Sequence, residues 1–191
     1  MPENAPIVIA GAGPVGLALA LGLARRAIRS IVLEKRPELS AHSKAVLIAP
    51  RTLEIFHEWR ILETFKSVGE WLEEVRPVDA ATGGEILCLD FSTLRPISAA
   101  PGVCILPQNE TERLLYDVCQ ASGFVEIRFG HAVTAFDSDE NGVRIRVQGP
   151  EGQYVLESPL LCGCDGAHSA VREGLGLHLE GKTYPAHAIL A

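Results

Sequence analysis

The sequence predicts a doubly wound α/β fold that acquires antiparallel hairpins in its second half. A short apolar run ends in glycine near the N-terminus, a segment rich in small residues follows, and a second apolar run begins at Ser30. Strand, helix and strand within about thirty residues form a βαβ unit, whose crossover is right-handed. Beyond Phe124 the pattern changes to strand-like pieces joined by tight turns such as Asn141-Gly142.

The first elements follow from local patterns. Residues 6–10 (PIVIA) are expected to form a strand buried on both faces of a parallel sheet. The alanine- and leucine-rich residues 14–27 predict a closely packed helix, and residues 30–34 predict the second buried strand. Two short helices are expected over residues 50–59 and 61–68.

The later elements mix hairpins with another helix. Residues 75–89 predict a hairpin around 82–84 (TGG), and residues 91–102, with two prolines, predict a loop. A strand over 103–106 and a helix over 107–122 follow. The remaining expected elements are three strands within 124–147, strands over 153–157 and 160–164, the start of a helix over 167–173, and a strand over 184–190.

Charge and cysteine content exclude several classes of function. The formal net charge of −7 argues against a general nucleic-acid binder, which would carry a basic face. Five cysteines, an odd number scattered through apolar segments, disfavour a disulfide scaffold and favour a reducing cytoplasm. Cys162 and Cys164 point to the same side of a strand. No second Cys/His pair has metal-ligand spacing, so both are expected to be packing residues.

One uncharged segment, residues 5–24, is long enough to suggest a membrane span or a signal peptide. Three features argue against both. An acidic residue, Glu3, precedes the segment, three glycines and a proline interrupt it, and its first part is β-branched and extended. We therefore expect no integral membrane segment.

Residues 11–16 read GAGPVG, which is the G-x-G-x-x-G pattern placed between a strand and a helix. Gly11 permits the tight turn, Gly13 lets a pyrophosphate approach the backbone, and Gly16 lets the helix pack closely on the strand. Pro14 and Val15 open the helix, whose N-terminus offers N–H groups and the positive end of its dipole to phosphates. These five residues are candidate contacts of a Rossmann-like dinucleotide site.

Glu34 closes the second strand roughly twenty residues after the glycines, where an acidic side chain bonds a ribose hydroxyl. This position favours an adenosine without a 2′-phosphate, as in FAD or NAD. Lys35 and Arg36 leave a second interpretation open, since basic groups at this point can meet a phosphate or remain solvated charges at a strand end.

Three further motifs follow in order along the chain. They are SKAVLIAPRTLEIF (43–56), LPQNETERLL (106–115) and CGCDGAHSAVR (162–172). With the glycine pattern, they resemble the FAD-dependent aromatic hydroxylases, which are single-component flavoprotein monooxygenases of the para-hydroxybenzoate and phenol hydroxylase type. The resemblance covers nearly the whole chain.

The resemblance implies that FAD is the cofactor, with its pyrophosphate on the glycine turn and its adenosine ribose on Glu34. Lys44 stands where the family usually has an arginine that reaches the FAD phosphate, so it keeps the charge without the bidentate fork. Gln108 matches a glutamine near the ribityl and phosphate region, and Val133 lies on the strand that passes the adenine. The alternatives are a solvated charge for Lys44 and a helix-capping segment at Gln108.

The Asp165-Gly166 pair lies at the carboxyl end of a strand, which is the edge where open α/β sheets bind ligands. The resemblance implies that Asp165 bonds the FAD ribityl chain. It also associates His168 and Arg172 with the phosphates of NADPH or NADH. The alternatives are a helix cap for Asp165 and ordinary surface positions for His168 and Arg172.

The function that the resemblance implies is the NADPH- or NADH-dependent hydroxylation of a small, phenol-like aromatic substrate. Because FAD carries the chemistry and the protein supplies binding, orientation and exclusion of water, no catalytic side chain is predicted. Two other functions stay open. One is a non-catalytic nucleotide-binding module, and the other is the FAD half of a related halogenase or reductase.

Residues 1–74 and 102–191 are expected to form an incomplete FAD-binding domain, with residues 75–101 as the start of a substrate-domain insertion. Members of the resembled family are longer and carry a later Gly-Asp motif, which does not occur after Gly166. We therefore expect an N-terminal portion that holds FAD poorly and hydroxylates slowly or not at all by itself. Its unfinished sheet edge and exposed apolar face favour self-association.

Overall fold

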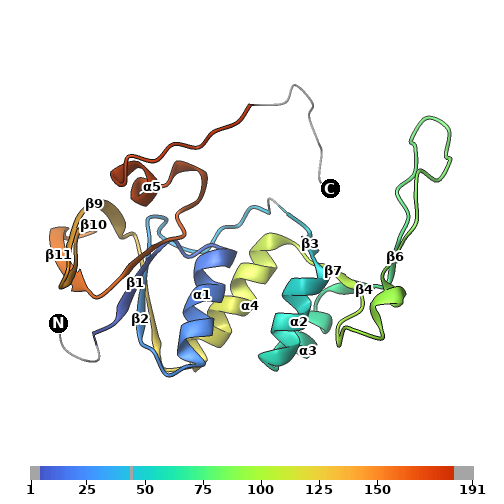
Figure 1. Cartoon of the computed structure of the whole chain (residues 1–191), viewed down its shortest axis with the longest axis horizontal. Helices are drawn as coiled ribbons and strands as arrows, with labels where there is room; N and C mark the ends of the chain where they lie inside the picture. The colour runs from blue at the N-terminus through green and yellow to red at the C-terminus, as the bar shows by residue number, and fades with distance from the viewer. Residues whose placement is uncertain (1–4, 44, 183–191) are drawn as a thin grey trace. The chain divides into compact units, whose positions relative to one another are not determined.

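The computed structural model describes residues 5–43 and 45–182 (Figure 1). The chain divides into two compact units. The first is built from the residues up to Ala41 and from Glu112 onward, and the second from His42–Thr111. The assignment of residues 75–101 to a substrate domain stays a prediction.

A four-stranded parallel sheet in the order β12-β1-β2-β8 forms the centre of the first unit. Its strands are β1 (Ile7–Ala10), β2 (Ser30–Glu34), β8 (Val125–Phe129) and β12 (Leu161–Gly163). Strand β2 is buried along its whole length, as the continuous apolar run of an internal parallel strand requires. The structure contains the predicted βαβ unit.

Helices cover one face of this sheet (Figure 1). Helix α1 (Pro14–Ala24) joins β1 to β2, and α4 (Gln108–Ala121) packs beside it. The Sγ of Cys119 in α4 donates to the carbonyl of Leu17 in α1 at 3.4 Å. Helix α1 ends before residue 27, where the prediction ended it, because Ala27 adopts a left-handed φ of 57°.

An antiparallel sheet packs on the opposite face of the parallel sheet (Figure 1). It comprises β9 (Ala132–Asp139), β10 (Gly142–Gly149) and β11 (Gly152–Ser158) in the order β11-β10-β9. Ile145 and Val147 of β10 form one buried cluster with Val8, Ile31 and Leu33 of the parallel sheet. Side chains alternate along a strand, so the next residues of β1 and β2 face the helices.

The segment after β12 differs from the single helix predicted over 167–173. It forms a 3-10 turn, η2 (Gly166–His168), and a separate short helix, α5 (Ala170–Gly174). Ser169 between them is extended, with φ −73° and ψ 112°, and its Oγ accepts the Arg172 N–H at 2.9 Å. Because this serine caps α5, the two turns cannot run together as one helix.

The second unit holds another antiparallel sheet, in the order β3-β7-β4. Its strands are β3 (Leu47–Ile48), β4 (Glu70–Leu72) and β7 (Val103–Ile105). Helices α2 (Pro50–Glu58) and α3 (Leu62–Lys66) pack through the rings of Phe56 and Phe65, whose centroids are 4.4 Å apart. The sequence predicted β7 and both helices. It did not predict β3 and β4, which are too short to show an alternating pattern.

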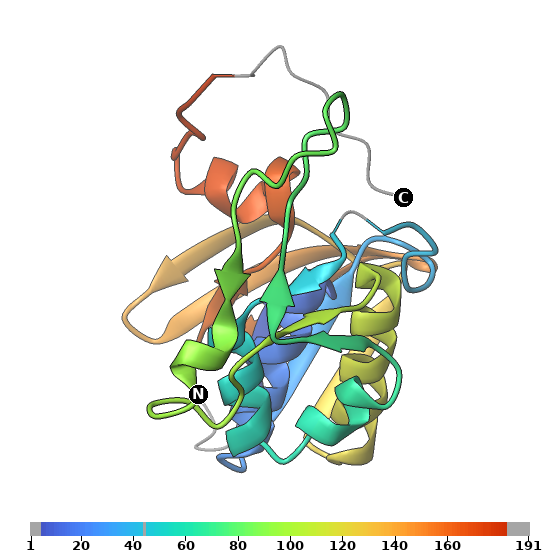
Figure 2. The same cartoon turned by 90° about the vertical axis from the view of Figure 1, so that its right-hand side faces the viewer.

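The hairpin expected around residues 82–84 is present, as two extended arms joined by a loop (Figure 2). Strand β5 (Glu74–Val75) pairs with β6 (Leu89–Asp90), and Val78 bridges to Glu85. A 3-10 turn, η1 (Phe91–Leu94), then occupies part of the predicted loop. The strand predicted over 184–190 lies outside the described residues. No helix in the described ranges is long and apolar enough to cross a membrane.

Candidate dinucleotide site

The carboxyl ends of the four parallel strands meet at one edge of the sheet. Gly11 follows β1 and Glu34 ends β2. His131 lies just beyond β8, and Asp165 just beyond β12. In an open α/β sheet this edge is the place where ligands bind.

A cavity of about 80 Å³ lies at this edge. Six lining residues were predicted from the sequence, namely Gly11, Glu34, Lys35, Val133, Asp165 and His168, and Ala10, Leu33, His131, Ala132 and Ala170 complete the lining. Pockets that enclose a whole drug-sized ligand usually measure roughly 300 Å³ or more. This cavity can therefore enclose only part of a dinucleotide.

The glycines of the turn are required for different reasons. Gly11 has a φ of 101°, and a Cβ on it would lie 2.4 Å from the carbonyl oxygen of Cys164. A Cβ on Gly16 would lie 1.9 Å from the carbonyl oxygen of Gly11. A Cβ on Gly13 would meet no atom within 4 Å, so the backbone at Gly13 faces open space. That space allows a phosphate to approach the main chain.

The N-terminus of α1 suits an anion. Gly13 is the N-cap and makes no side-chain cap hydrogen bond, and Pro14 occupies the first turn. The side chain of Val15 is exposed, and the first turn contains no acidic residue. The positive end of the helix dipole therefore meets no competing carboxylate from its own first turn.

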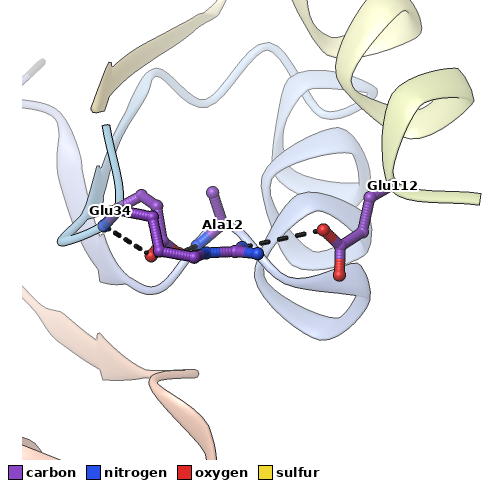
Figure 3. Close-up of polar contacts among 4 residues, drawn as sticks. Ala12, Glu34 and Glu112 are labelled. Carbon is purple, nitrogen blue, oxygen red and sulfur yellow. Dashed lines mark hydrogen bonds and ion pairs between the residues drawn. The ribbon is translucent and has the colours of Figure 1, made fainter. Parts of the chain in front are cut away.

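Glu34 is buried and accepts hydrogen bonds from four N–H groups of Ala12 and Arg36 (Figure 3). Its Oε2 accepts the Ala12 N–H at 2.9 Å, and its Oε1 accepts the Arg36 backbone N–H and Nε–H at 3.0 Å each. Burial raises the pKa of Glu34, but the hydrogen bonds from Arg36 and Ala12 outweigh burial and hold it below its ordinary value. The fourth bond, from Nη2 of Arg36 to Oε2, is long at 3.4 Å, so this acceptor direction of Oε2 is only weakly engaged and can accept a hydroxyl.

Arg36 lies between two carboxylates. Its Nη2 is 3.4 Å from Oε2 of Glu34 and 3.6 Å from Oε2 of Glu112, a side chain of α4 that is 2% exposed. The hydrogen bond to Glu34 raises the pKa of Arg36, and Glu112 adds to the rise. These contacts disfavour the phosphate-binding interpretation of Arg36. Lys35, by contrast, is exposed beside the cavity.

Asp165 both lines the cavity and supports the start of α5. Its Oδ1 accepts the Ser169 hydroxyl at 2.6 Å, and its Oδ2 accepts the Val171 N–H at 3.3 Å. Arg172 donates to the carbonyl oxygens of Gly166 and Ala167 at 3.3 and 2.7 Å, so its guanidinium braces turn η2.

The structure does not test two of the predicted contacts. Lys44 lies outside the described residues. Gln108 belongs to the second unit, where its N–H donates to the Ala45 carbonyl at 2.9 Å and to the Ser43 hydroxyl at 3.0 Å. The roles of Lys44 and Gln108 at FAD stay predictions.

The two cysteines beside the site are packing residues. Burial raises the pKa of both the Cys162 and Cys164 thiols, which disfavours the reactive thiolate form. Cys164 packs against the glycine turn, since its Cβ lies 3.4 Å from where a Cβ on Gly16 would stand.

His131 is a polar cavity residue that was not singled out from the sequence. Its backbone N–H donates to the Glu34 carbonyl at 2.9 Å, and its Nδ1 lies 2.9 Å from the Tyr154 hydroxyl. The rule that ligands bind at strand ends applies to His131 as it does to Asp165. The apolar pattern of the sequence does not show that β8 joins the parallel sheet, so His131 carries no signal in the sequence.

Comparison with known proteins identifies the family. A model of the FAD binding domain family matches residues 4–190. The chain belongs to this family. The match confirms the predicted α/β flavoprotein fold, and FAD is the cofactor of this FAD binding domain.

The relatives of this FAD binding domain are monooxygenases. It is 38% identical over 189 residues to 12-dehydrotetracycline 5-monooxygenase/anhydrotetracycline 6-monooxygenase of Streptomyces rimosus, covering 97% of this chain and 35% of that protein. The p-nitrophenol 4-monooxygenase structure from Pseudomonas putida matches with a TM-score of 0.88 and 29% identity, covering 94% of this chain and 45% of that one. A flavin-dependent monooxygenase solved with FAD and substrate matches with a TM-score of 0.84 and 28% identity. The match covers 95% of this chain and 33% of that one. The chain thus spans a third to less than half of the length of these proteins.

The described residues fit the adenosine and pyrophosphate end of FAD. The open face of Gly13 and the uncapped start of α1 suit the pyrophosphate. The acceptor direction of Glu34 Oε2 that Nη2 of Arg36 engages only at 3.4 Å suits a ribose hydroxyl at the small cavity.

Proposed function

We propose that the chain is the FAD-binding portion of an NADPH- or NADH-dependent monooxygenase that hydroxylates a small, phenol-like aromatic substrate. The observation that carries the proposal is the cavity at the carboxyl edge of the parallel sheet, next to an open glycine turn. The monooxygenases to which this FAD binding domain is similar support the reaction class.

The chain's own residues bind and orient the cofactor. The backbone at Gly13 and the N-terminus of α1 hold the pyrophosphate, and Glu34 accepts a hydrogen bond from the adenosine ribose. Lys44 and Gln108 meet the phosphates and the ribityl chain, and Asp165 bonds the ribityl chain. When bound, FAD supplies the redox and oxygen-transfer chemistry, and these residues set its position.

The reductant meets the same edge of the sheet. His168 is exposed on turn η2 and lines the cavity, where a ring N–H can donate to a phosphate. We assign it to the phosphates of NADPH or NADH. Steady-state oxidation of each nicotinamide by the FAD-loaded protein will show which one is used.

Equilibrium dialysis of the purified chain against FAD and ADP tests the cofactor assignment. We expect the chain to bind FAD more tightly than ADP, because FAD adds contacts from its ribityl and flavin parts. Equal binding of FAD and ADP, or a preference for ADP, would instead indicate a nucleotide-binding module that contacts only the adenosine half of FAD.

Isotope labelling tests the reaction. The FAD-loaded protein is supplied with NADPH or NADH, a panel of phenols and ¹⁸O₂, and products are analysed by mass spectrometry. One labelled oxygen atom per product is expected, even at a slow rate. Oxidation of the nicotinamide without a labelled product would contradict a hydroxylase.

We also propose that the chain self-associates and works in the cytoplasm. Apolar side chains along the 74–90 hairpin are 44–63% exposed, namely Val78, Ile86, Leu87 and Leu89, and they form a candidate contact surface. All five cysteines are free, as a reducing compartment favours. Sedimentation velocity at increasing concentration should show a rising sedimentation coefficient, and a constant monomer value would contradict self-association. Cell fractionation tests the location.

A further inference from the structure

The guanidinium of Arg36 makes an uneven fork with the carboxylate of Glu34. Its Nε lies 3.0 Å from Oε1, whereas its Nη2 lies 3.4 Å from Oε2. In an even bidentate pair, both N–O distances are about 2.7–2.9 Å. The hydrogen bond from Nη2 to Glu34 is therefore longer and weaker than the one from Nε.

A second carboxylate, that of Glu112, also attracts Nη2 of Arg36. Oε2 of Glu112 lies 3.6 Å from the same Nη2, so Glu34 and Glu112 share this nitrogen. Glu112 is 2% exposed, and a buried carboxylate requires charged or hydrogen-bonding partners. The attraction of Glu112 therefore opposes closure of the Arg36 fork on Glu34.

The long Nη2 bond leaves part of the acceptor capacity of Glu34 Oε2 unused. The Ala12 N–H at 2.9 Å fills one of its acceptor directions. The Nη2 at 3.4 Å engages the other only weakly. Because Glu34 lines the cavity, this direction is available to a ligand hydroxyl.

We infer that Glu112 is a positioning residue for the adenosine ribose, acting through Arg36. By sharing Nη2 of Arg36, it keeps one acceptor direction of Glu34 open for a ribose hydroxyl. Without the Glu112 charge, the fork closes and satisfies the Glu34 carboxylate internally. This role rests on the proposed function, in which the adenosine of FAD occupies the cavity.

The test measures recognition of a single hydroxyl. The wild-type chain and Glu112→Gln, which keeps the side-chain size and removes the charge, are titrated calorimetrically with ADP, 2′-deoxy-ADP and 3′-deoxy-ADP. A hydroxyl bonded to a carboxylate should favour ADP over one deoxy analogue by about tenfold or more in the wild type. In Glu112→Gln this ratio should fall toward one.

The ratio of the affinity for ADP to the affinity for the deoxy analogue distinguishes a positioning role of Glu112 from a purely structural one. A structural defect weakens all three nucleotides equally and leaves the ratio at its wild-type value, which would overturn the inference. Asp117→Asn is the matched control, because it removes an exposed carboxylate from the same helix. This variant should keep the wild-type ratio.

Two further outcomes are decisive. If circular dichroism shows that Glu112→Gln does not fold, Glu112→Asp replaces it, because the shorter side chain moves the charge away from Nη2. For Glu112→Asp, an affinity ratio between one and the wild-type value supports the inference, and the wild-type ratio overturns it. A wild-type chain that binds ADP without preferring it over either analogue overturns the ribose site itself, and this inference with it.

Discussion

At the scale of single residues, the three glycines of the turn differ in whether the fold itself requires them. Gly11 and Gly16 are required by the protein itself, because a side chain at either would collide with backbone atoms of the same unit. Gly13 is not, since a methyl group there would meet only open space. Packing within the protein therefore does not require glycine at position 13, which agrees with the proposed approach of a pyrophosphate to this backbone.

Two alanine substitutions test this separation. Gly16→Ala should lower the free energy of unfolding by about 1–3 kcal/mol or more, because helix α1 must move away from Gly11. Gly13→Ala should change it by less than about 0.5 kcal/mol while weakening FAD binding. Urea unfolding and FAD titration measure the two effects. A Gly13→Ala variant that binds FAD normally would contradict the proposed path of the pyrophosphate.

Glu34 makes the stability of the chain depend on pH. Burial raises its pKa, but the bonds from Arg36 and Ala12 outweigh burial, so the folded-state pKa lies below the ordinary value of 4.5. A group with a lowered folded-state pKa contributes stability that is fully present above its unfolded pKa. That stability is lost as the pH falls through the folded-state value.

We therefore expect the difference in unfolding free energy between the wild type and Glu34→Gln to be constant from about pH 7 to pH 5. Below the ordinary value of 4.5 the difference should shrink. Urea titrations at several pH values provide the measurement. A difference that grows on acidification would mean that burial outweighs the hydrogen bonds.

At the scale of elements, the site depends on short connections after parallel strands. Turn η2 and helix α5 are held by a small network in which Ser169 bonds both Asp165 and the Arg172 N–H. The sequence indicated the strand and the helix but not the break between them. Ser169 therefore joins Asp165, which lines the cavity, to the start of the helix.

Ser169→Ala should lower the free energy of unfolding by about 1 kcal/mol, because α5 loses its cap. Hydrogen exchange should also become faster in α5 than in β10. Ser138→Ala, on the exposed end of the β9–β10 hairpin, is the control and should leave both quantities unchanged. Equal effects of the two substitutions would show that the cap contributes nothing.

At the scale of the whole molecule, FAD binding should stabilise the fold. Ligand present at 100 times its dissociation constant adds about 2.7 kcal/mol to the free energy of unfolding, provided that it binds only the folded state. Thermal unfolding of the wild type should therefore shift upward with FAD. Gly13→Ala should shift less at the same FAD concentration, and an equal shift would place FAD elsewhere.

Much of the first unit could be predicted because its signals are local. Strands β1 and β2, the glycine turn and Glu34 occupy the first 34 residues, and the predicted β2 boundaries match the structure. Strands β3 and β4 were not predicted, because strands of two or three residues show no periodicity. The end of α1 was placed too late because the left-handed turn at Ala27 contains no glycine.

Local patterns in the sequence were enough to predict the fold class and the family, and to propose which residues meet the cofactor's phosphates, since each depends on neighbours in the chain. The tertiary structure alone decided how Arg36 is used. Its basic charge permitted a phosphate contact, but folding brings Glu112, from a distant helix, within 3.6 Å of its guanidinium. Residues that meet only after folding leave no spacing pattern in the sequence, and here such residues set the hydrogen bonds and the charge around Glu34.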